Sequence, residues 1–453
     1  MKSQKTVFIT ISRVGFIRNL LRTGVVSKLL GHGFRVILLT PYHNAPELFK
    51  DFTHKNLHIE QLYMSQNVRL RWFFTELFKG AVFNDTVYAR YRWSIGTPKQ
   101  PNQLFFPMRM IFFAPLRFVP GARCFIRWLY AFINPLRAHD YLFEKYKPDL
   151  VFNTDAGGDC GVLKSAKRFG VPSIDMPKSW DSLSQMLFNT KADFLLVWNE
   201  YMRAQAIKLQ CYKENEIVVT GIPQFDFYAR KDGLLSREEF CKKYGMDSKK
   251  KIILYGSAGA NLFDESAHVS LIRQFMDDRK LSEANILVRP HVGYYGDVER
   301  FSSLESNAGI VIDRSGKHNH VAHDPFDTSE GHVHTLVNSL YYADVCVNVA
   351  STLSLDAIAC GTEVINFNFD IGHVDYHAGV RRLFVSDYVK DLMATNGTFL
   401  AKNKEDFLNM LKNVLEKGEK KDTKKTVDTF IYKLDGKSAE RIANALIQIM
   451  NQS

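Results

Sequence analysis

Short apolar runs alternate with helical spacing along most of this 453-residue chain, and this alternation constrains the fold more than any other feature. In residues 7–40, two apolar runs enclose a helical pattern that two glycines end. A strand–helix–strand unit of this kind requires parallel strands. The alternation recurs at 149–175 and 194–220, and restarts at 252–367. The sequence therefore predicts an α/β protein with two successive doubly wound parallel sheets.

The domain boundary is predicted where the alternation stops. Residues 230–251 are charged and poorly periodic, which is typical of a passage between domains. We expect an N-terminal domain at 1–229, a C-terminal domain at 230–430, and a helical segment at 431–453 that packs back on the N-terminal domain.

The charge balance favours an anionic partner without choosing one. The chain has 59 Lys and Arg against 48 Asp and Glu, a net charge of +11. Phosphates of a small substrate, a membrane surface and nucleic acid all fit that charge. The chain has no zinc-finger, helix-turn-helix or RNP pattern, so no motif supports nucleic acid. Scattered cysteines without a CxxC pair, and no signal-type N-terminus or long uncharged window, predict a cytoplasmic protein.

The stretch NVASTLSLDAIACGTEVINF, residues 348–367, has the composition of a nucleotide site. Ser351 and Thr352 follow an apolar strand and open a helix, whose unpaired N–H groups can hold a diphosphate without a metal. The alternative is that either residue is only an N-cap. Asp356 lies one turn later on the same face, where its carboxylate can reach ribose hydroxyls.

Two further strand–loop junctions in the second half have phosphate-binding character. Residues 255–259 read YGSAG and offer small side chains, free amides and the hydroxyl of Ser257. Arg289-Pro290-His291 follows another strand, so the guanidinium can pair with phosphate oxygens and the imidazole can donate to one. The alternative is an Arg–Asp surface pair and a capped loop.

These motifs resemble a known family. The pattern ST-x-x-x-D-A-x-x-x-G-x-x-V-I is similar to the donor-binding element of GT-B glycosyltransferases. More narrowly, the chain resembles bacterial surface-polysaccharide transferases and CDP-glycerol glycerophosphotransferases, with UDP-N-acetylglucosamine 2-epimerases as structural relatives. Residues 178–181 (KSWD) and 197–226 support the resemblance, which covers about residues 145–445. Val292 departs from it, because a proline usually follows the histidine.

The resemblance implies a GT-B fold, with two Rossmann-like domains facing a central cleft. It also implies a role at the leaving phosphate for His291 and an acceptor contact at Asp181. The implied donor-binding residues are Gly256, Ser257, Arg289, His291, Ser351, Thr352 and Asp356.

The acceptor is expected on the N-terminal domain. Residues 153–159 (NTDAGGD) follow a strand, and an inverting transfer needs a base that Asp155 or Asp159 can provide. Gly15 and Arg18, on the first strand–helix loop, are further acceptor-binding candidates. A loop aspartate is also a common cap or turn former, and retaining enzymes lack an obvious base, so the stereochemistry stays open.

No metal or other cofactor is expected. The segment 318–334 contains five histidines, but it has neither HExxH nor a Cys/His spacing, and we interpret it as a polar loop that covers the donor rather than as a zinc site. The sequence also contains no Asp-x-Asp. Helix N-termini and Arg289 are therefore expected to neutralise the diphosphate.

Residues 104–137 have an interfacial character. They contain nine aromatic residues, five arginines and no acid. A spanning helix would bury arginine at about 2.5–3.5 kcal/mol each, so we reject one. The alternatives are a buried aromatic part of the acceptor domain, or a surface whose aromatics enter the headgroup region while its arginines meet anionic lipid phosphates.

The sequence thus predicts a metal-independent GT-B glycosyltransferase. It would move a sugar from a nucleotide-sugar donor to a cell-surface glycan or lipid-linked acceptor, at the inner face of the cell membrane. The second possibility is a CDP-alcohol glycerophospho- or ribitolphosphotransferase of teichoic-acid type. An epimerase is less favoured because its acid cluster is not evident, and a basic nucleic-acid-binding protein is the non-enzyme alternative.

Overall fold

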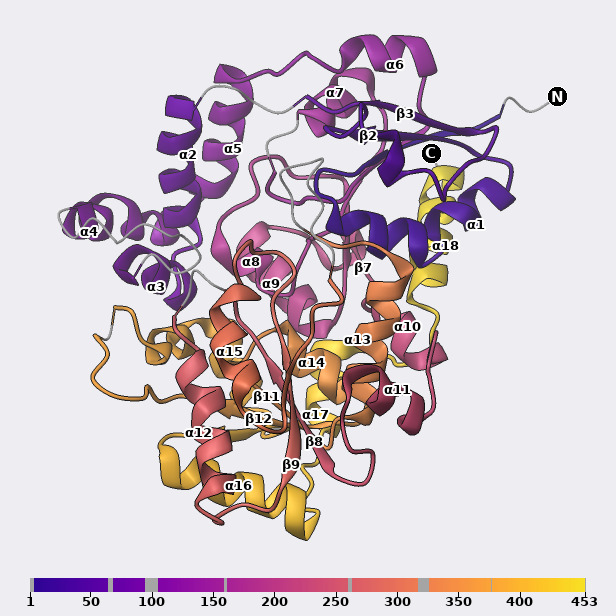
Figure 1. Ribbon diagram of the computed structural model, residues 1–453. Helices are drawn as coiled ribbons and strands as arrows, with labels where there is room; N and C mark the ends of the chain where they lie inside the picture. The colour runs from indigo at the N-terminus through magenta and orange to yellow at the C-terminus, as the bar shows by residue number, and fades with distance from the viewer. Residues whose placement is uncertain are drawn as a thin grey trace. The chain divides into compact units, whose positions relative to one another are not determined.

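The computed structural model describes residues 4–63, 68–93, 105–158, 161–259, 263–316, 326–375 and 377–452. The chain forms two compact units (Figure 1). The first comprises Met1–Tyr91, Asn102–Asp226 and Lys437–Ser453, and the second comprises Arg92–Pro101 and Phe227–Gly436. The chain therefore passes between the units after Tyr91, Pro101, Asp226 and Gly436.

The first unit contains a seven-stranded sheet in the order β3-β2-β1-β4-β5-β6-β7, and all of its strand pairs are parallel. The strand order reverses between β1 and β4, which makes that edge the topological switch point. Its strands are β1 Thr6–Thr10, β2 Arg35–Thr40, β3 Leu57–Gln61, β4 Leu150–Asn153, β5 Ser173–Asp175, β6 Phe194–Val197 and β7 Ile217–Val219.

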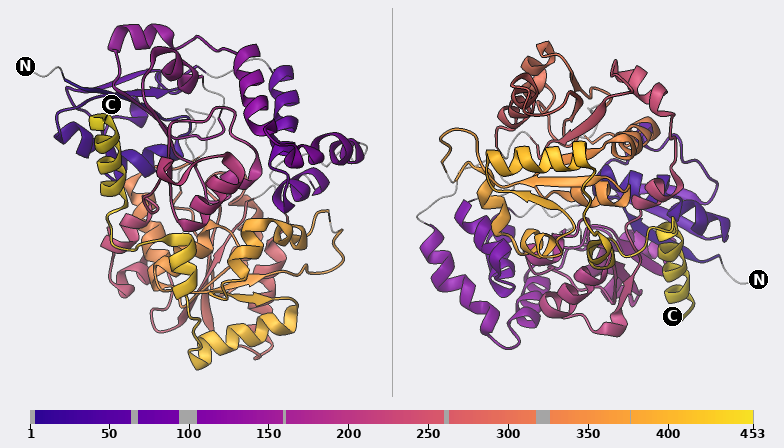
Figure 2. Two further views of the ribbon diagram at one scale, coloured as in Figure 1. Left: turned by 180° about the vertical axis from the view of Figure 1, so that it is seen from behind. Right: turned by 90° about the horizontal axis from the view of Figure 1, so that it is seen from below.

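The helices of the first unit include the last one of the chain. In that unit α18 contacts α1, and Lys5 Nζ donates to Met450 O at 2.7 Å (Figures 1 and 2). Asp226 accepts the N–H groups of Ser438 and Ala439, each at 2.9 Å, which caps the start of α18. The helices are α1 Val25–Gly31, α2 Val68–Ala81, α3 Asp85–Trp93, α4 Phe105–Met108, α5 Ala122–Ile133, α6 Asp140–Tyr146, α7 Val162–Phe169, α8 Ser182–Gln185, α9 Glu200–Gln210 and α18 Ser438–Gln452. Helix α10, Phe225–Arg230, begins in the first unit, and its residues from Phe227 onward belong to the second.

The second unit repeats the same plan with a six-stranded parallel sheet in the order β10-β9-β8-β11-β12-β13. Its switch point lies between β8 and β11. The strands are β8 Lys251–Gly256, β9 Ala284–Arg289, β10 Ile310–Ile312, β11 Val345–Asn348, β12 Glu363–Phe367 and β13 Phe399–Ala401. The helices are α11 Arg237–Tyr244, α12 Ser266–Asp277, α13 Glu330–Tyr342, α14 Thr352–Ala359, α15 Asp387–Met393, α16 Lys404–Lys417 and α17 Lys424–Thr426.

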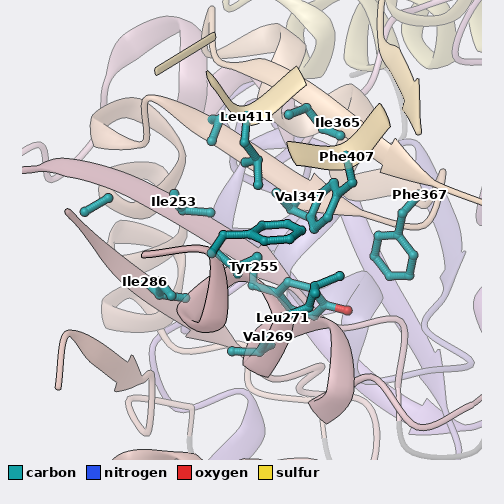
Figure 3. Close-up of a cluster of buried hydrophobic side chains, with 14 of the residues drawn as sticks. Ile253, Tyr255, Val269, Leu271, Ile286, Val347, Ile365, Phe367, Phe407 and Leu411 are labelled. Atoms are coloured by element: carbon teal, nitrogen blue, oxygen red, sulfur yellow. The ribbon is translucent and has the colours of Figure 1, made fainter. Parts of the chain in front are cut away.

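The core of the second unit lies between its sheet and helices α12 and α16 (Figure 3). Tyr255 from β8 stacks with Phe367 from β12 at a ring-centroid distance of 6.1 Å, and Phe407 from α16 packs on Phe367. These side chains are fully buried. This core fixes the strand ends that carry the candidate site.

The structure corrects three details of the expected elements. The helix expected at residues 17–30 is broken, because Gly24 adopts a positive φ of 90° between a π-helical turn at Ile17–Arg22 and α1. His332 and His334 lie in the first turns of α13, not in a polar loop, because Ser329 caps that helix. Strands β3 and β13 had no sequence prediction, since one is a half-exposed edge and the other has three residues.

Candidate functional site

The candidate donor loops meet at the switch point of the second sheet. The loop before α14 follows β11, and the loop 256–259 follows β8, which is its neighbour in the sheet. Arg289 ends β9 and pairs with Gly256 in the strand register. Ligands of doubly wound sheets bind outside the carboxyl ends of strands at this position. The topology therefore brings together all three segments that the sequence selected.

Ser351 is the N-cap of α14. Its Oγ accepts the Leu353 N–H at 3.2 Å, and Thr352 is the first residue of the helix. Ala350 has a φ of +40°, which an L-residue rarely adopts and which marks local strain. Ser351 therefore does cap α14, as one alternative expected. Donor contacts by Ser351 and Thr352 stay predictions.

Two asparagines that sequence reasoning did not select hold the same loop. Asn348 Oδ1 accepts Ser351 N–H at 3.2 Å and Ser354 Oγ at 2.9 Å. Asn366 Oδ1 accepts Ala350 N–H at 2.5 Å. Asn348 ends the buried strand β11, and Asn366 is the residue before the last in the buried strand β12. A buried amide side chain is costly unless it is hydrogen-bonded, so these positions were the available signal.

Asp356 is buried on α14, with 5% of its surface exposed. Its Oδ1 accepts the hydroxyl of Tyr228, from α10, at 2.8 Å. A ribose contact would have to share or replace this bond, so that role remains a prediction. Gly256 has a packing reason for lacking a side chain, because a Cβ there would overlap Leu353 at the start of α14.

Arg289 forms a buried ion pair. Its Nη1 lies 2.5 Å from Asp313 Oδ2, and its Nη2 lies 3.3 Å from His332 Nε2. Burial opposes ionisation of Asp313, but the Arg289 guanidinium and the Ser315 hydrogen bonds hold its pKa below the ordinary value. The sequence alternative was an Arg–Asp pair at the surface, whereas this pair is buried. Phosphate binding by Arg289 stays a prediction.

His291 is oriented by its own loop. Its Nδ1 accepts the N–H of Gly293 at 3.0 Å, so the neutral ring carries its proton on Nε2. Its backbone N–H donates to Asp297 Oδ2 at 2.6 Å. A small cavity of about 20 Å³ beside it is lined by residues of this loop together with Asp313 and His332. In this geometry His291 can donate a hydrogen bond to a phosphate oxygen.

The candidate acceptor residues lie at the switch point of the first sheet, after β1, β4 and β5. Asp155 is 9% exposed and accepts Ser12 Oγ at 3.0 Å. Asp181 precedes α8 and accepts the side chain of Gln185. Burial and the Arg13 guanidinium lower the pKa of Lys178, while Asp155 and Asp181 oppose that shift. These two carboxylates therefore share one neighbourhood with a half-buried lysine that sequence reasoning did not list as a site residue.

A third carboxyl group, that of Asp175, lies near Asp155. Asp175, at the end of β5, is fully buried, and burial raises its pKa to about 8. Its Oδ1 accepts Asn153 Nδ2 at 2.8 Å, and Thr10 Oγ1 donates to Asn153 Oδ1 at 2.9 Å. Gly15 and Arg18 lie on the β1 loop and at the start of the next helical turn, where Arg18 Nε donates to Asn19. Asp159 falls outside the described residues.

The described ranges contain no cluster of three or more His, Cys, Asp or Glu side chains that could hold a metal ion. His318, His320 and His323 fall outside those ranges. Within the same ranges, no helix is both long enough and apolar enough to cross a bilayer.

A family model describes most of this chain. The model of the CDP-glycerol:poly(glycerophosphate) glycerophosphotransferase family matches residues 161–448, which is more than half of the sequence. The chain belongs to this family. The matched range contains α14, the Arg289–His291 segment and the 256–259 loop, and ends within α18. Family membership makes the chain a transferase.

Solved structures show the same fold. A UDP-N-acetylglucosamine 2-epimerase from Methanocaldococcus jannaschii has a TM-score of 0.55 at 14% identity, covering 99% of this chain and 100% of its own. The Neisseria meningitidis epimerase bound to UDP-N-acetylglucosamine has a TM-score of 0.54 at 10% identity, covering 98% and 100%. A Listeria monocytogenes protein assigned as the same enzyme reaches 0.58 at 11% identity, covering 100% and 98%. The glycosyltransferase-like GT-B fold expected from the sequence is confirmed. No curated protein sequence matches this chain.

Proposed function

We propose that this transferase moves glycerol phosphate, or a related polyol phosphate, from a CDP-linked donor to a hydroxyl group of a cell-surface polymer or its lipid-linked precursor. The observation that supports this choice is the family match across residues 161–448. In this reaction an acceptor oxygen attacks the donor phosphorus next to the polyol, the diphosphate P–O bond breaks, and CMP leaves. The acceptor proton goes to a base, for which Asp155 is the candidate.

Sugar transfer from a nucleotide sugar is the second candidate. The fold is shared with the Neisseria epimerase, whose structure holds UDP-N-acetylglucosamine. In this reaction the bond between the anomeric carbon and oxygen breaks, and a nucleoside diphosphate leaves. Both reactions use a donor that contains a nucleoside diphosphate. The candidate donor loops of the second unit therefore suit either reaction.

A donor panel separates the two candidates. Calorimetry with CDP-glycerol, CDP-ribitol, a UDP-sugar and a GDP-sugar should give measurable heat for the CDP-alcohols alone. Binding confined to a nucleotide sugar would support the second candidate, and no binding to any donor would contradict both.

We also propose that transfer needs no divalent cation. The start of α14, Arg289 and His291 supply the positive potential that a diphosphate requires. Turnover should therefore continue in EDTA at its untreated rate. Loss of turnover in EDTA, with recovery in Mg²⁺ or Mn²⁺, would contradict this proposal.

The acceptor proposal includes docking on an anionic membrane surface. Phe125, Trp128 and Phe132 form an exposed aromatic stripe on α5, with exposures of 58%, 60% and 73%. Trp128 stacks on Phe132 at 5.8 Å, so the stripe is continuous. The opposite face of α5, which includes Ile126 and Tyr130, is buried. Exposed aromatics of this kind enter the headgroup boundary of a bilayer.

The arginines of this segment do not all behave as the sequence suggested. Arg109 pairs with Glu76 at 3.0 Å, Arg123 donates to Ala81 O at 3.0 Å, and buried Arg127 donates to Phe188 O at 2.9 Å. These guanidinium groups serve the protein interior rather than lipid phosphates. Exposed cations in the same region include Arg69 and Arg71 on the adjacent α2, Arg117 before α5 and Arg137 after it.

Vesicle flotation tests the docking surface. The protein should float with vesicles of phosphatidylcholine and phosphatidylglycerol, and W128A/F132A should float several-fold less. Phe169→Ala, which removes an exposed aromatic from α7, is the matched control and should float like the wild type. If all three proteins float equally, or if none of them floats, the stripe does not dock on anionic membranes.

A further inference from the structure

A group of buried charges beneath the donor loops has no part in the function proposed above. Glu265 and Asp297 are both fully buried, and they share the guanidinium of Arg300. Arg300 Nε lies 2.8 Å from Asp297 Oδ1, and its Nη2 contacts Glu265. Two fully buried acids beside a partly buried arginine are costly unless specific contacts offset the desolvation. The contacts they make therefore indicate what they are for.

Ser257 connects these charges. Its Oγ lies 2.7 Å from Asp297 Oδ2 and 3.0 Å from Glu265 Oε2, and it accepts Arg300 Nη2 at 2.7 Å. The single hydroxyl proton can serve only one carboxylate at a time. Burial raises the pKa of the Glu265 carboxyl to about 7, which weakens its competition with Asp297 for this proton. The hydroxyl is thus already engaged on several sides.

The two acids also hold backbone. Glu265 Oε2 accepts the N–H of Ala258 at 2.9 Å, and Asp297 Oδ2 accepts the N–H of His291 at 2.6 Å. Ala258 belongs to the loop after β8 and His291 to the loop after β9. The loops also touch directly, because a Cβ on Gly259 would overlap the ring of Tyr294.

We propose that Glu265 and Asp297 are positioning residues that lock these two loops together for the donor diphosphate. In this arrangement the Ser257 hydroxyl belongs to the lock and does not contact the donor. The lock holds the His291 ring in place, and its Nε2–H meets the diphosphate. The inference rests on the proposed function, since it concerns the same donor site, and it replaces the direct role that the sequence implied for Ser257.

Graded substitutions at Asp297 test the lock. Asp297→Asn keeps an oxygen for the His291 N–H but removes the charge, whereas Asp297→Ala removes both. Affinity for CDP should fall in the order wild type, Asn, Ala, with a loss of about tenfold or more for Ala. Affinity for cytidine, which lacks phosphates, should stay constant. Glu265→Gln should lower CDP affinity by about as much as Asp297→Asn does. Glu299→Gln, which changes an exposed acid two residues after Asp297, is the matched control and should bind CDP like the wild type.

Calorimetry with CDP and ligand-observed NMR with cytidine supply the readout, and thermal unfolding confirms that each variant is folded. If Asp297→Ala does not fold, Asp297→Asn and Glu265→Gln decide the question. An unchanged CDP-to-cytidine affinity ratio in folded variants, or a parallel fall for both ligands, would overturn the inference. Binding of neither ligand by the wild type would overturn the proposed function, and the inference with it.

Discussion

At the scale of single residues, the proton on His291 is the most specific feature of the donor site. Because Nδ1 accepts the Gly293 N–H, the neutral ring can only donate through Nε2. A glutamine amide nitrogen can occupy that position, whereas the shorter asparagine cannot. His291→Asn should lose about 10²-fold or more in turnover, as when one transition-state donor is removed, and His291→Gln should lose less. Equal losses in steady-state assays would instead indicate proton transfer by His291.

Asp155 is the residue on which acceptor activation depends. If it is the base, Asp155→Asn should lower turnover by about 10²–10⁴-fold and leave donor affinity unchanged. Steady-state kinetics and CDP calorimetry measure the two effects separately. Glu144→Gln, an exposed acid on α6, is the control. A nearly unaffected rate would transfer the role to Asp159 or indicate a mechanism without a base.

Asp175 predicts a pH dependence of stability. Burial raises the pKa of its carboxyl from 3.8 to about 8, so the folded state keeps a proton that the unfolded state releases above pH 3.8. This group's contribution to stability therefore falls as the pH rises from about 4 to 8. Asp175→Asn imitates the neutral acid and should become progressively more stable than the wild type over that window. Urea unfolding at pH 5 and pH 8 measures it, and a constant difference would contradict the raised pKa.

At the scale of elements, the start of α14 depends on Gly256. A Cβ at that position would overlap the Leu353 side chain, so Gly256→Ala must displace that side chain in the first turn of α14. Overpacking of this kind costs about 1–3 kcal/mol of unfolding free energy, and the shift should also weaken nucleotide binding. Gly31→Ala, in α1 with open space around it, should change stability by at most about 1 kcal/mol. Equal effects of the two substitutions in urea unfolding would contradict this packing.

The elements themselves were largely predictable because buried parallel strands are continuous apolar runs. Thirteen strands form the two described sheets, and the runs at β1, β2, β4 and β8 had clear signals. Hydrogen-bond partners were not predictable in the same way. Arg289 faces Asp313 and His332, and Asp356 faces Tyr228, through contacts between residues far apart in the sequence. Strand periodicity places a side chain at a strand end, but it does not choose that side chain's partner.

At the scale of the whole molecule, the sequence motifs indicated the family, but they did not identify the group that is transferred. The motif at 351–365 resembles donor-binding elements of GT-B glycosyltransferases in general, so it does not choose between nucleotide sugars and CDP-alcohols. The family match favours glycerol phosphate, while the GT-B fold is compatible with either. The two reactions differ in the bond that breaks, and so in the nucleotide that leaves.

The identity of the released nucleotide therefore tests the central claim most directly. The enzyme is incubated with CDP-glycerol and a membrane-lipid acceptor extract, in parallel with UDP-sugars, and the nucleotides are separated by anion-exchange chromatography. We predict acceptor-dependent release of CMP from CDP-glycerol, unchanged in EDTA and abolished in Asp155→Asn. Release of a nucleoside diphosphate from a nucleotide sugar, with no CMP from CDP-glycerol, would contradict polyol-phosphate transfer and establish sugar transfer instead.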